Sequence, residues 1–283
     1  MNKPFMTKFL FLLTVCTLFL FPHHTAAVEH SWSRAFQQHI STWISTLESK
    51  DPQFREWKNA DAHVTDLGAN SHQWLVSLVK QGKPVGYLVV GEHQQQGNEQ
   101  TPTFVLLEYG LGEYVLFNDA LAPPSGKTRQ VYDGFAAYWV EIQNNMTQYI
   151  DAKTGERYSS FLKPGPAVMP TVESSQLLQQ QQELVQVRKI SDQERDPFEE
   201  IDWLIEGSNK LEKRTPPQWK KLSKTDHSAS LVLTTTLFEN ELVAPFTIGT
   251  VHVWKQDVTY VGVWDQGLRF LPSAYIDKVG YLQ

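Results

Sequence analysis

The apolar positions near the start of the chain follow the period of a helix. Between Ser31 and Leu47, apolar residues recur three or four positions apart, at Trp32, Phe36, Ile40, Trp43, Ile44 and Leu47. This spacing puts them on one face and predicts an amphipathic helix. Asp51-Pro52 then has the form of an N-cap followed by proline at the first helical position. A short second helix carrying Phe54 and Trp57 is therefore expected.

From Gln73 onward apolar residues recur at every second position, which predicts strands. The alternating runs 74–79 and 85–90 flank Lys80-Gln81-Gly82-Lys83-Pro84 and have the pattern of a hairpin. Asn144-Asn145 has the residue types of a tight turn. Further strands are expected over 104–108, 114–117, 138–143 and 148–150. Residues 28–163 are thus predicted to form an α+β domain, with helices followed by an antiparallel meander.

A change of composition at Lys163-Pro164-Gly165-Pro166 marks a break in the chain. A glutamine-rich stretch follows, and we expect 164–190 to be a linker that leads into a polar helix. In 191–283 we expect a second α+β domain. Its short helices would run from Asp196 to Gly207 and start again at Thr215, and its strands would cover 230–238, 246–254, 258–264 and 268–271. The predicted fold class is α+β, in two sub-domains that each have N-terminal helices packed on an antiparallel sheet.

The first residues have the form of a secretory signal peptide. Lys3 and Lys8 accompany an uncharged apolar run from Phe9 to Phe21, and Thr25-Ala26-Ala27 offers small residues for cleavage. The run is shorter than the roughly 20 residues that a membrane-spanning helix needs. We expect residues 1–27 to be removed near Ala27 and the protein to be secreted or extracytoplasmic. Retention of the segment as an anchor is the alternative.

Composition narrows the classes of function. The chain has 283 residues, with 25 Lys and Arg against 31 Asp and Glu, so it lacks the basic charge of a nucleic-acid-binding protein. Its one cysteine, Cys16, lies in the predicted leader, which leaves the mature chain without a thiol nucleophile or thiolate ligand. No cofactor or metal is expected, and a metal site built from His63, Asp66 and His72 is the alternative. Asn145-Met146-Thr147 has the form of a glycosylation sequon.

One segment resembles a known family. Ala137 to Ile142, followed by Gln148-Tyr149-Ile150-Asp151-Ala152-Lys153-Thr154-Gly155-Glu156, is similar to the C-terminal hairpin of PepSY-type modules and, more loosely, of cystatin-like folds. Asp151 is expected to bond the backbone of the turn, and Gly155 to adopt a positive φ. The resemblance covers 137–156. It implies a non-catalytic exported module of a kind associated with peptidase propeptides, for which inhibition or regulation of an extracellular peptidase has been proposed.

The tail also resembles a known fold. Gly267-Leu268-Arg269-Phe270-Leu271-Pro272-Ser273-Ala274-Tyr275-Ile276 looks like the ending of an SH3-type barrel, where Pro and Tyr help to line a peptide groove. A strand that closes a small sheet explains the decapeptide equally well.

These observations favour a binding or regulatory role over catalysis. The expected partner is an extracytoplasmic protein, with a peptidase as one candidate, bound through an exposed strand edge or the 94–103 loop. The first alternative is a carbohydrate or cell-envelope binder. Candidate contact residues for a ligand or partner are Trp219, Trp254, Trp264 and Tyr275. The second alternative is a hydrolase, and a pocket with two carboxylates or a His–Asp pair would favour it.

Overall fold

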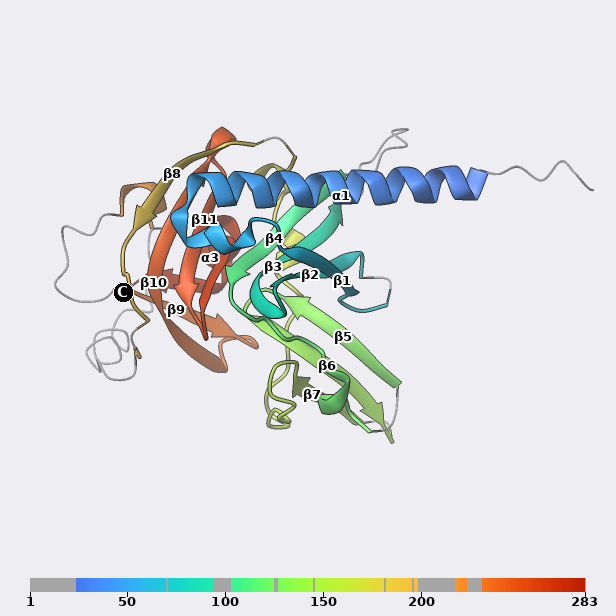
Figure 1. The fold of residues 1–283 in the computed structure, drawn as a ribbon. Coiled ribbons are helices and arrows are strands. Elements are labelled where there is room, and N and C mark those ends of the chain that lie inside the picture. The colour runs from blue at the N-terminus through green and yellow to red at the C-terminus, as the bar shows by residue number, and fades with distance from the viewer. Residues whose placement is uncertain are drawn as a thin grey trace, which may run out of the picture.

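A computed structural model of the chain describes residues 24–69, 71–93, 103–124, 127–144, 146–180, 182–194, 196–197, 217–222 and 231–282. Two antiparallel sheets dominate this part of the chain (Figure 1). The larger has ten strands, nine of them in the order β1-β2-β3-β4-β12-β11-β10-β9-β13, with β8 paired to β10. The smaller sheet has the order β5-β6-β7. The predicted mixture of helices and mostly antiparallel strands is therefore confirmed.

The predicted N-terminal helix is confirmed as α1, His24–Lys50, which begins inside the predicted leader. It lies across the large sheet and buries Phe36, Ile40, Trp43 and Leu47 (Figure 1). Asp51 then caps the 3₁₀ helix η1, Pro52–Trp57, by accepting a hydrogen bond from the Gln53 amide at 3.0 Å. No helix among the described residues is long and apolar enough to cross a membrane.

Four strands follow as a meander: β1 (Asp61–Asp66), β2 (Gln73–Lys80), β3 (Lys83–His93) and β4 (Thr103–Leu111). The β2–β3 hairpin agrees with the alternating pattern, and Gly82 takes a φ of +74° in its turn. The strand predicted over 114–117 is wrong. Tyr114, Leu116 and Phe117 are buried, but they pack into the core from irregular chain that pairs with no described strand.

The small sheet consists of β5 (Lys127–Asp133), β6 (Ala136–Gln143) and β7 (Met146–Asp151). β6 and β7 form the predicted hairpin, in which Asn144 has a φ of +50°. The Asp151 Oδ1 atom accepts the amides of Lys153 and Thr154, each at 2.8 Å, and Gly155 has a φ of +73°. This turn has the predicted geometry, whereas the resemblance to PepSY-type modules stays a prediction.

The predicted linker contains the short 3₁₀ turns η3 (Met169–Thr171) and η4 (Ser174–Gln176), and the polar helix predicted after it is wrong. Residues Leu184–Lys189 instead form strand β8, whose backbone pairs with β10 (Leu242–Trp254). The helix predicted from Asp196 to Gly207 falls almost wholly outside the described residues. Thr215 also lies outside them, and the following described segment contains only the short turn η5, Trp219–Lys221.

The C-terminal strands are close to those predicted: β9 (Val232–Leu237), β10, β11 (Thr259–Trp264) and β12 (Leu268–Pro272). Helix α3 (Ser273–Val279) then leads to β13 (Gly280–Leu282), which pairs with β9. The strand order here is β12-β11-β10-β9-β13, and α3 lies directly before the last of these strands in the chain. The resemblance of the tail to the ending of an SH3-type barrel stays a prediction.

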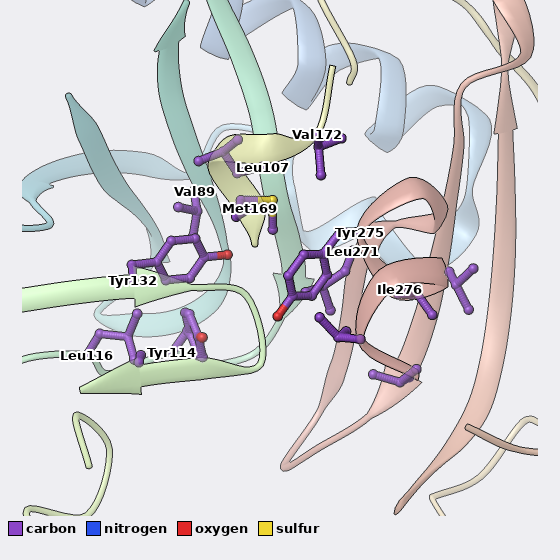
Figure 2. Close-up of a cluster of buried hydrophobic side chains, with 14 of the residues drawn as sticks. Val89, Leu107, Tyr114, Leu116, Tyr132, Met169, Val172, Leu271, Tyr275 and Ile276 are labelled. Atoms are coloured by element: carbon purple, nitrogen blue, oxygen red, sulfur yellow. The ribbon is translucent and has the colours of Figure 1, made fainter. Parts of the chain in front are cut away.

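The two halves of the chain share one sheet and one interior. β12 pairs with β4 through Arg269 to Gly110 and Phe270 to Tyr109. On one face, side chains from α1, η1 and strands of both halves form a single cluster. On the other face, a second cluster joins the small sheet, β3 and β4 to α3, and Figure 2 shows Tyr132, Met169 and Tyr275 within it. Charged residues from distant segments therefore meet in the core.

Candidate functional site

The structure places the predicted contact residues mostly in the interior. Trp219, Trp254 and Tyr275 are 5%, 1% and 0% exposed, and Trp264 is half-buried. The indole of Trp219 donates to Asp277 at 2.8 Å, which holds its ring against the fold. Every described tryptophan is buried or half-buried, while Trp203 lies outside the described residues. A ledge of exposed indole rings for a sugar is thus not formed in the part of the chain that the structure describes.

Tyr275 does not line an open groove, because the β5–β6 turn covers it. Its hydroxyl donates to the Asp133 carbonyl at 2.6 Å and accepts from the Phe135 amide at 3.1 Å. A Cβ atom on Gly134 would come within 2.5 Å of the Tyr275 ring, and Gly134 has a φ of +62°, so both space and conformation require glycine there. The chain itself therefore covers Tyr275, the residue that was expected to line a peptide groove.

Two charged residues face each other at the centre of the core. Glu108 on β4 is 0% exposed and Arg269 on β12 is 2% exposed. Arg269 donates from Nε and Nη2 to the two carboxylate oxygens at 2.8 and 3.1 Å. The hydroxyls of Tyr87 and Tyr132 donate to the same carboxylate at 2.5 and 2.6 Å. A buried ion pair is tolerated only when its remaining polar atoms are also bonded, and this one meets that condition.

The ion pair extends toward the surface through Asp265 and Lys153. Arg269 donates to Asp265, and Lys153 donates to the same carboxylate at 2.7 Å. Burial alone would raise the pKa of Asp265, but the positive charges of Arg269 and Lys153 outweigh it and lower that pKa to about 2. Burial also tends to lower the pKa of Arg269, and the Glu108 carboxylate reverses this and raises it well above its usual value. Asp265 and Arg269 therefore stay charged at neutral pH.

A second buried chain of polar groups consists of Asp51, His252 and Tyr109, each 0% exposed. His252 Nε2 lies 3.0 Å from the Asp51 carboxylate, and its Nδ1 lies 2.8 Å from the Tyr109 hydroxyl. Burial lowers the pKa of His252 although Asp51 opposes this, and burial raises the pKa of Tyr109. A neutral imidazole fits both contacts, since Nε2–H donates to Asp51 and Nδ1 accepts the tyrosine proton.

This His–Asp pair resembles part of a hydrolase site, but no substrate can reach it. A general base must lie within hydrogen-bonding distance of the proton that it removes. Here Phe54 and Phe270 pack on the imidazole, at ring-centroid distances of 5.8 and 4.3 Å, and both phenyl rings are buried. The pair therefore holds η1 against β10 and does not supply catalytic groups to a pocket.

A pocket of about 230 Å³ opens between the β9–β10 turn, β6 and the 164–168 segment. Two carboxyl groups line it, those of Asp133 and Glu239, together with the rings of Tyr138 and Phe238. Both oxygens of Asp133 accept backbone amides, from Val168 at 2.9 Å and Met169 at 2.5 Å. Burial raises the pKa of Asp133, and those two amides oppose the rise. Asp133 thus anchors the rim of the pocket as well as contributing charge to it.

The turn that forms one wall of the pocket has an unusual backbone. Phe238, Glu239 and Asn240 all have positive φ values, of 51°, 58° and 72°. A left-handed conformation costs a residue with a side chain about 1–2 kcal/mol. Burial of the Phe238 side chain offsets this conformational cost. Phe238 is 6% exposed and packs on Tyr158 and Tyr138 at ring-centroid distances of 4.8 and 5.8 Å. The buried phenylalanine therefore holds the turn, and Glu239 with it, at the mouth of the pocket.

A different kind of surface lies at the end of the large sheet, where β1 pairs with β2 and with no other described strand. All six residues of β1 are exposed, and the Val64 side chain is 43% exposed. The Leu67 amide donates to the Gln73 carbonyl at 2.9 Å. This hydrogen bond shows which alternate residues of β1 direct their backbone N–H and C=O groups toward β2. Odd-numbered residues of β1 therefore bond to β2, whereas Ala62, Val64 and Asp66 point their N–H and C=O groups away from it.

The alternative metal site is not assembled. Among the described residues, no three His, Cys, Asp or Glu side chains are grouped closely enough to hold an ion. His63 and Asp66 belong to β1, and His72 contacts Glu92 at 2.7 Å. The 94–103 loop falls outside the described residues apart from Thr103.

Comparisons with known proteins give no relative: no family model, no curated protein and no solved structure matches the chain. The function is therefore inferred from the residues themselves. Neither the pocket nor the charged core was predicted from the sequence, because their members are far apart in it. Glu108 and Arg269, for example, are separated by 161 positions.

Proposed function

We propose that the protein is an exported, non-catalytic binding or regulatory protein that takes an extended segment of a partner onto the free edge of β1. The observation that carries this proposal is the outward direction of the backbone groups of Ala62, Val64 and Asp66 on a fully exposed strand. An unpaired edge is a template for strand addition, in which main-chain hydrogen bonds supply affinity and side chains supply specificity.

The charges on β1 indicate the chemistry of the partner. Asp61 and Asp66 lie at the two ends of the strand, and among the described residues neither is part of an ion pair. Val64 stands between them as an exposed apolar side chain. A segment with Lys or Arg near its ends and an apolar residue beside Val64 would complement this edge. Self-pairing of two β1 strands would instead leave an acidic residue at each end of both strands with no Lys or Arg of β1 to neutralise it, so a different protein is the proposed partner.

The partner is proposed to be an extracytoplasmic protein, with a peptidase as the first candidate. Export is inferred from Lys3, Lys8 and the Phe9 to Phe21 run, which lie outside the described residues. The proposed organisation also keeps two α+β sub-domains, over 28–163 and 191–283. Their shared sheet would give β1 a rigid support.

A binding role accounts for the ionisable groups better than hydrolysis does. The His252–Asp51 pair and the Glu108–Arg269 pair are sealed in the core. The pocket does hold two carboxyl groups, but both oxygens of Asp133 accept backbone amides, and no histidine or serine is among its lining residues.

Capture from culture medium by the immobilised mature chain tests the proposal. The Val64→Pro variant removes an outward-facing amide, and Val64→Thr keeps it in a strand-forming residue. The wild type and Val64→Thr are expected to retain the same protein, and Val64→Pro is expected to lose it while circular dichroism shows an intact fold. Capture that Val64→Pro leaves unchanged, or recovery of the bait alone, would contradict the proposal. Cleavage of the captured protein by the bait would favour the hydrolase.

A further inference from the structure

We propose that the pocket between the β9–β10 turn and β6 is a second binding site, which takes a positively charged amino or guanidino group carried on an alkyl chain. The site is independent of the β1 edge, because none of its lining residues belongs to β1. Four residues carry the argument: Asp133 and Glu239 supply negative charge, and Tyr138 and Phe238 supply aromatic rings.

The charge balance of the pocket favours a cation. Its two carboxyl groups face one described ammonium group, that of Lys278. Lys278 is already held by Thr171, since its Nζ atom donates to the Thr171 carbonyl at 3.0 Å and to its hydroxyl at 2.9 Å. No described residue forms an ion pair with Glu239. An entering cation would therefore find at the mouth the exposed Glu239 carboxylate, which no described cation pairs with.

Tyr138 offers a hydrogen-bonding group to a ligand. Its side chain lines the pocket and is 6% exposed, and among the described residues no hydrogen bond joins its hydroxyl to another group. Burial, reinforced by the charge of Asp133, raises the pKa of Tyr138 to about 12, so the hydroxyl keeps its proton at neutral pH. It can then bond to a polar group that enters the pocket.

The rings and the volume define the rest of the ligand. Tyr138 and Phe238 lie with their ring centroids 5.8 Å apart, and the faces of aromatic rings attract cations. The pocket of about 230 Å³ has room for one alkyl chain with its head group and is too small for a nucleotide cofactor. Two sources share this chemistry: a free small amine, and the side chain of a lysine or arginine on a polypeptide.

Ligand-observed NMR with the full mature chain tests this site. The probe for a free amine is n-butylammonium, with n-butanol as its neutral counterpart. The probe for a side chain is acetyl-Gly-Lys-Gly-amide, with norleucine in place of lysine as the counterpart. Binding of both charged probes assigns the site to the amine itself, and binding of the peptide alone assigns it to a partner side chain. Equal binding of charged and neutral probes, or binding of neither charged probe, would overturn the proposal.

Amino-acid substitutions test whether the charged probe binds in this pocket. Glu239→Gln and Tyr138→Phe keep the side-chain volumes and leave the amide contacts of Asp133 in place. Each is expected to lower the affinity for the charged probe about threefold to tenfold, which is the effect of losing a partly exposed charged contact or one hydrogen bond. Glu241→Gln is the matched control, because Glu241 is an exposed residue of the same turn that does not line the pocket. If both pocket variants bind like this control, the cation lies elsewhere and the proposal is wrong.

Discussion

The Glu108 carboxylate and the Arg269 guanidinium form a two-point ion pair between β4 and β12, with contacts of 2.8 and 3.1 Å. The pair lies where the N-terminal meander and the C-terminal strands meet in one sheet. Tyr132 brings the small sheet to the same carboxylate at 2.6 Å. One carboxyl group thus links three parts of the fold, and its loss should affect stability more than any surface charge does.

We expect Arg269→Met to lower the free energy of unfolding by about 3–5 kcal/mol, because it leaves the Glu108 charge buried without a cation. Urea denaturation measures the change. The control is Lys220→Met, which breaks the exposed ion pair with Asp257 and should cost about 0–1 kcal/mol. The double variant Glu108→Leu with Arg269→Met removes both charges and should recover part of the loss. A single-variant loss no greater than the control would show that the pair does not stabilise the fold.

Stability should also depend on pH through His252. Burial lowers its pKa below the ordinary value of 6.5, so the unfolded chain takes up a proton before the folded protein does. The contribution of His252 is therefore complete above pH 6.5 and is lost as the pH falls from 6.5 toward the lowered value. One such histidine gives a slope of at most about 1.4 kcal/mol per pH unit. The pKa of Asp51 is also lowered, so this carboxyl group changes the stability only when the pH falls below its ordinary pKa of 3.8.

Urea denaturation between pH 7 and pH 5 measures this slope. His252→Gln should flatten it. His39 must be considered too, because burial also lowers its pKa and it acts in the same pH range. His39→Gln is therefore the matched control, and the difference in slope between the wild type and His252→Gln belongs to His252. An unchanged slope in His252→Gln would show that the imidazole takes up its proton in the folded protein as readily as in the unfolded chain.

The sequence predicts those elements that bury one face. The spacing from Trp32 to Leu47 predicts α1, and the alternation around Gly82 predicts β2 and β3, because each pattern reflects burial on one side. β1 has no such pattern, since all its residues are exposed. β8 was mistaken for a helix because Leu184, Val185 and Val187 fit either period over so short a run.

The candidate site was harder to predict, because tertiary structure creates it. The pocket combines Asp133 and Tyr138 from the small sheet with Phe238 and Glu239 from a turn about 100 positions later in the chain. Trp254 is an expected contact residue because its ring is aromatic, and Tyr275 because of the resemblance of the tail to an SH3-type ending, yet both are buried. Large aromatic side chains are as typical of a core as of a binding surface. Composition alone does not distinguish these two environments.

Close packing under η1 gives another test. A Cβ atom on Gly86 would lie 2.1 Å from Trp57 Nε1, which donates to the Val85 carbonyl at 3.1 Å. Gly86→Ala should therefore displace the indole and lower the free energy of unfolding by about 1–3 kcal/mol. Urea denaturation followed by tryptophan fluorescence measures it. Gly165→Ala is the control, because its nearest contact is the flexible Glu239 side chain at 3.3 Å, and it should stay within about 0.5 kcal/mol of wild type.

The direction of the backbone groups on β1 predicts opposite outcomes for prolines at neighbouring positions. His63 pairs with Ser77 at an odd position, so its amide bonds to β2, whereas the Val64 amide points outward. His63→Pro removes a ladder hydrogen bond and should destabilise the protein by at least about 1 kcal/mol more than Val64→Pro does. Urea denaturation compares the two, with His63→Ala and Val64→Ala correcting for the side chains. Equal losses would contradict the assigned alternation, in which the His63 amide bonds to β2 and the Val64 amide points away from it.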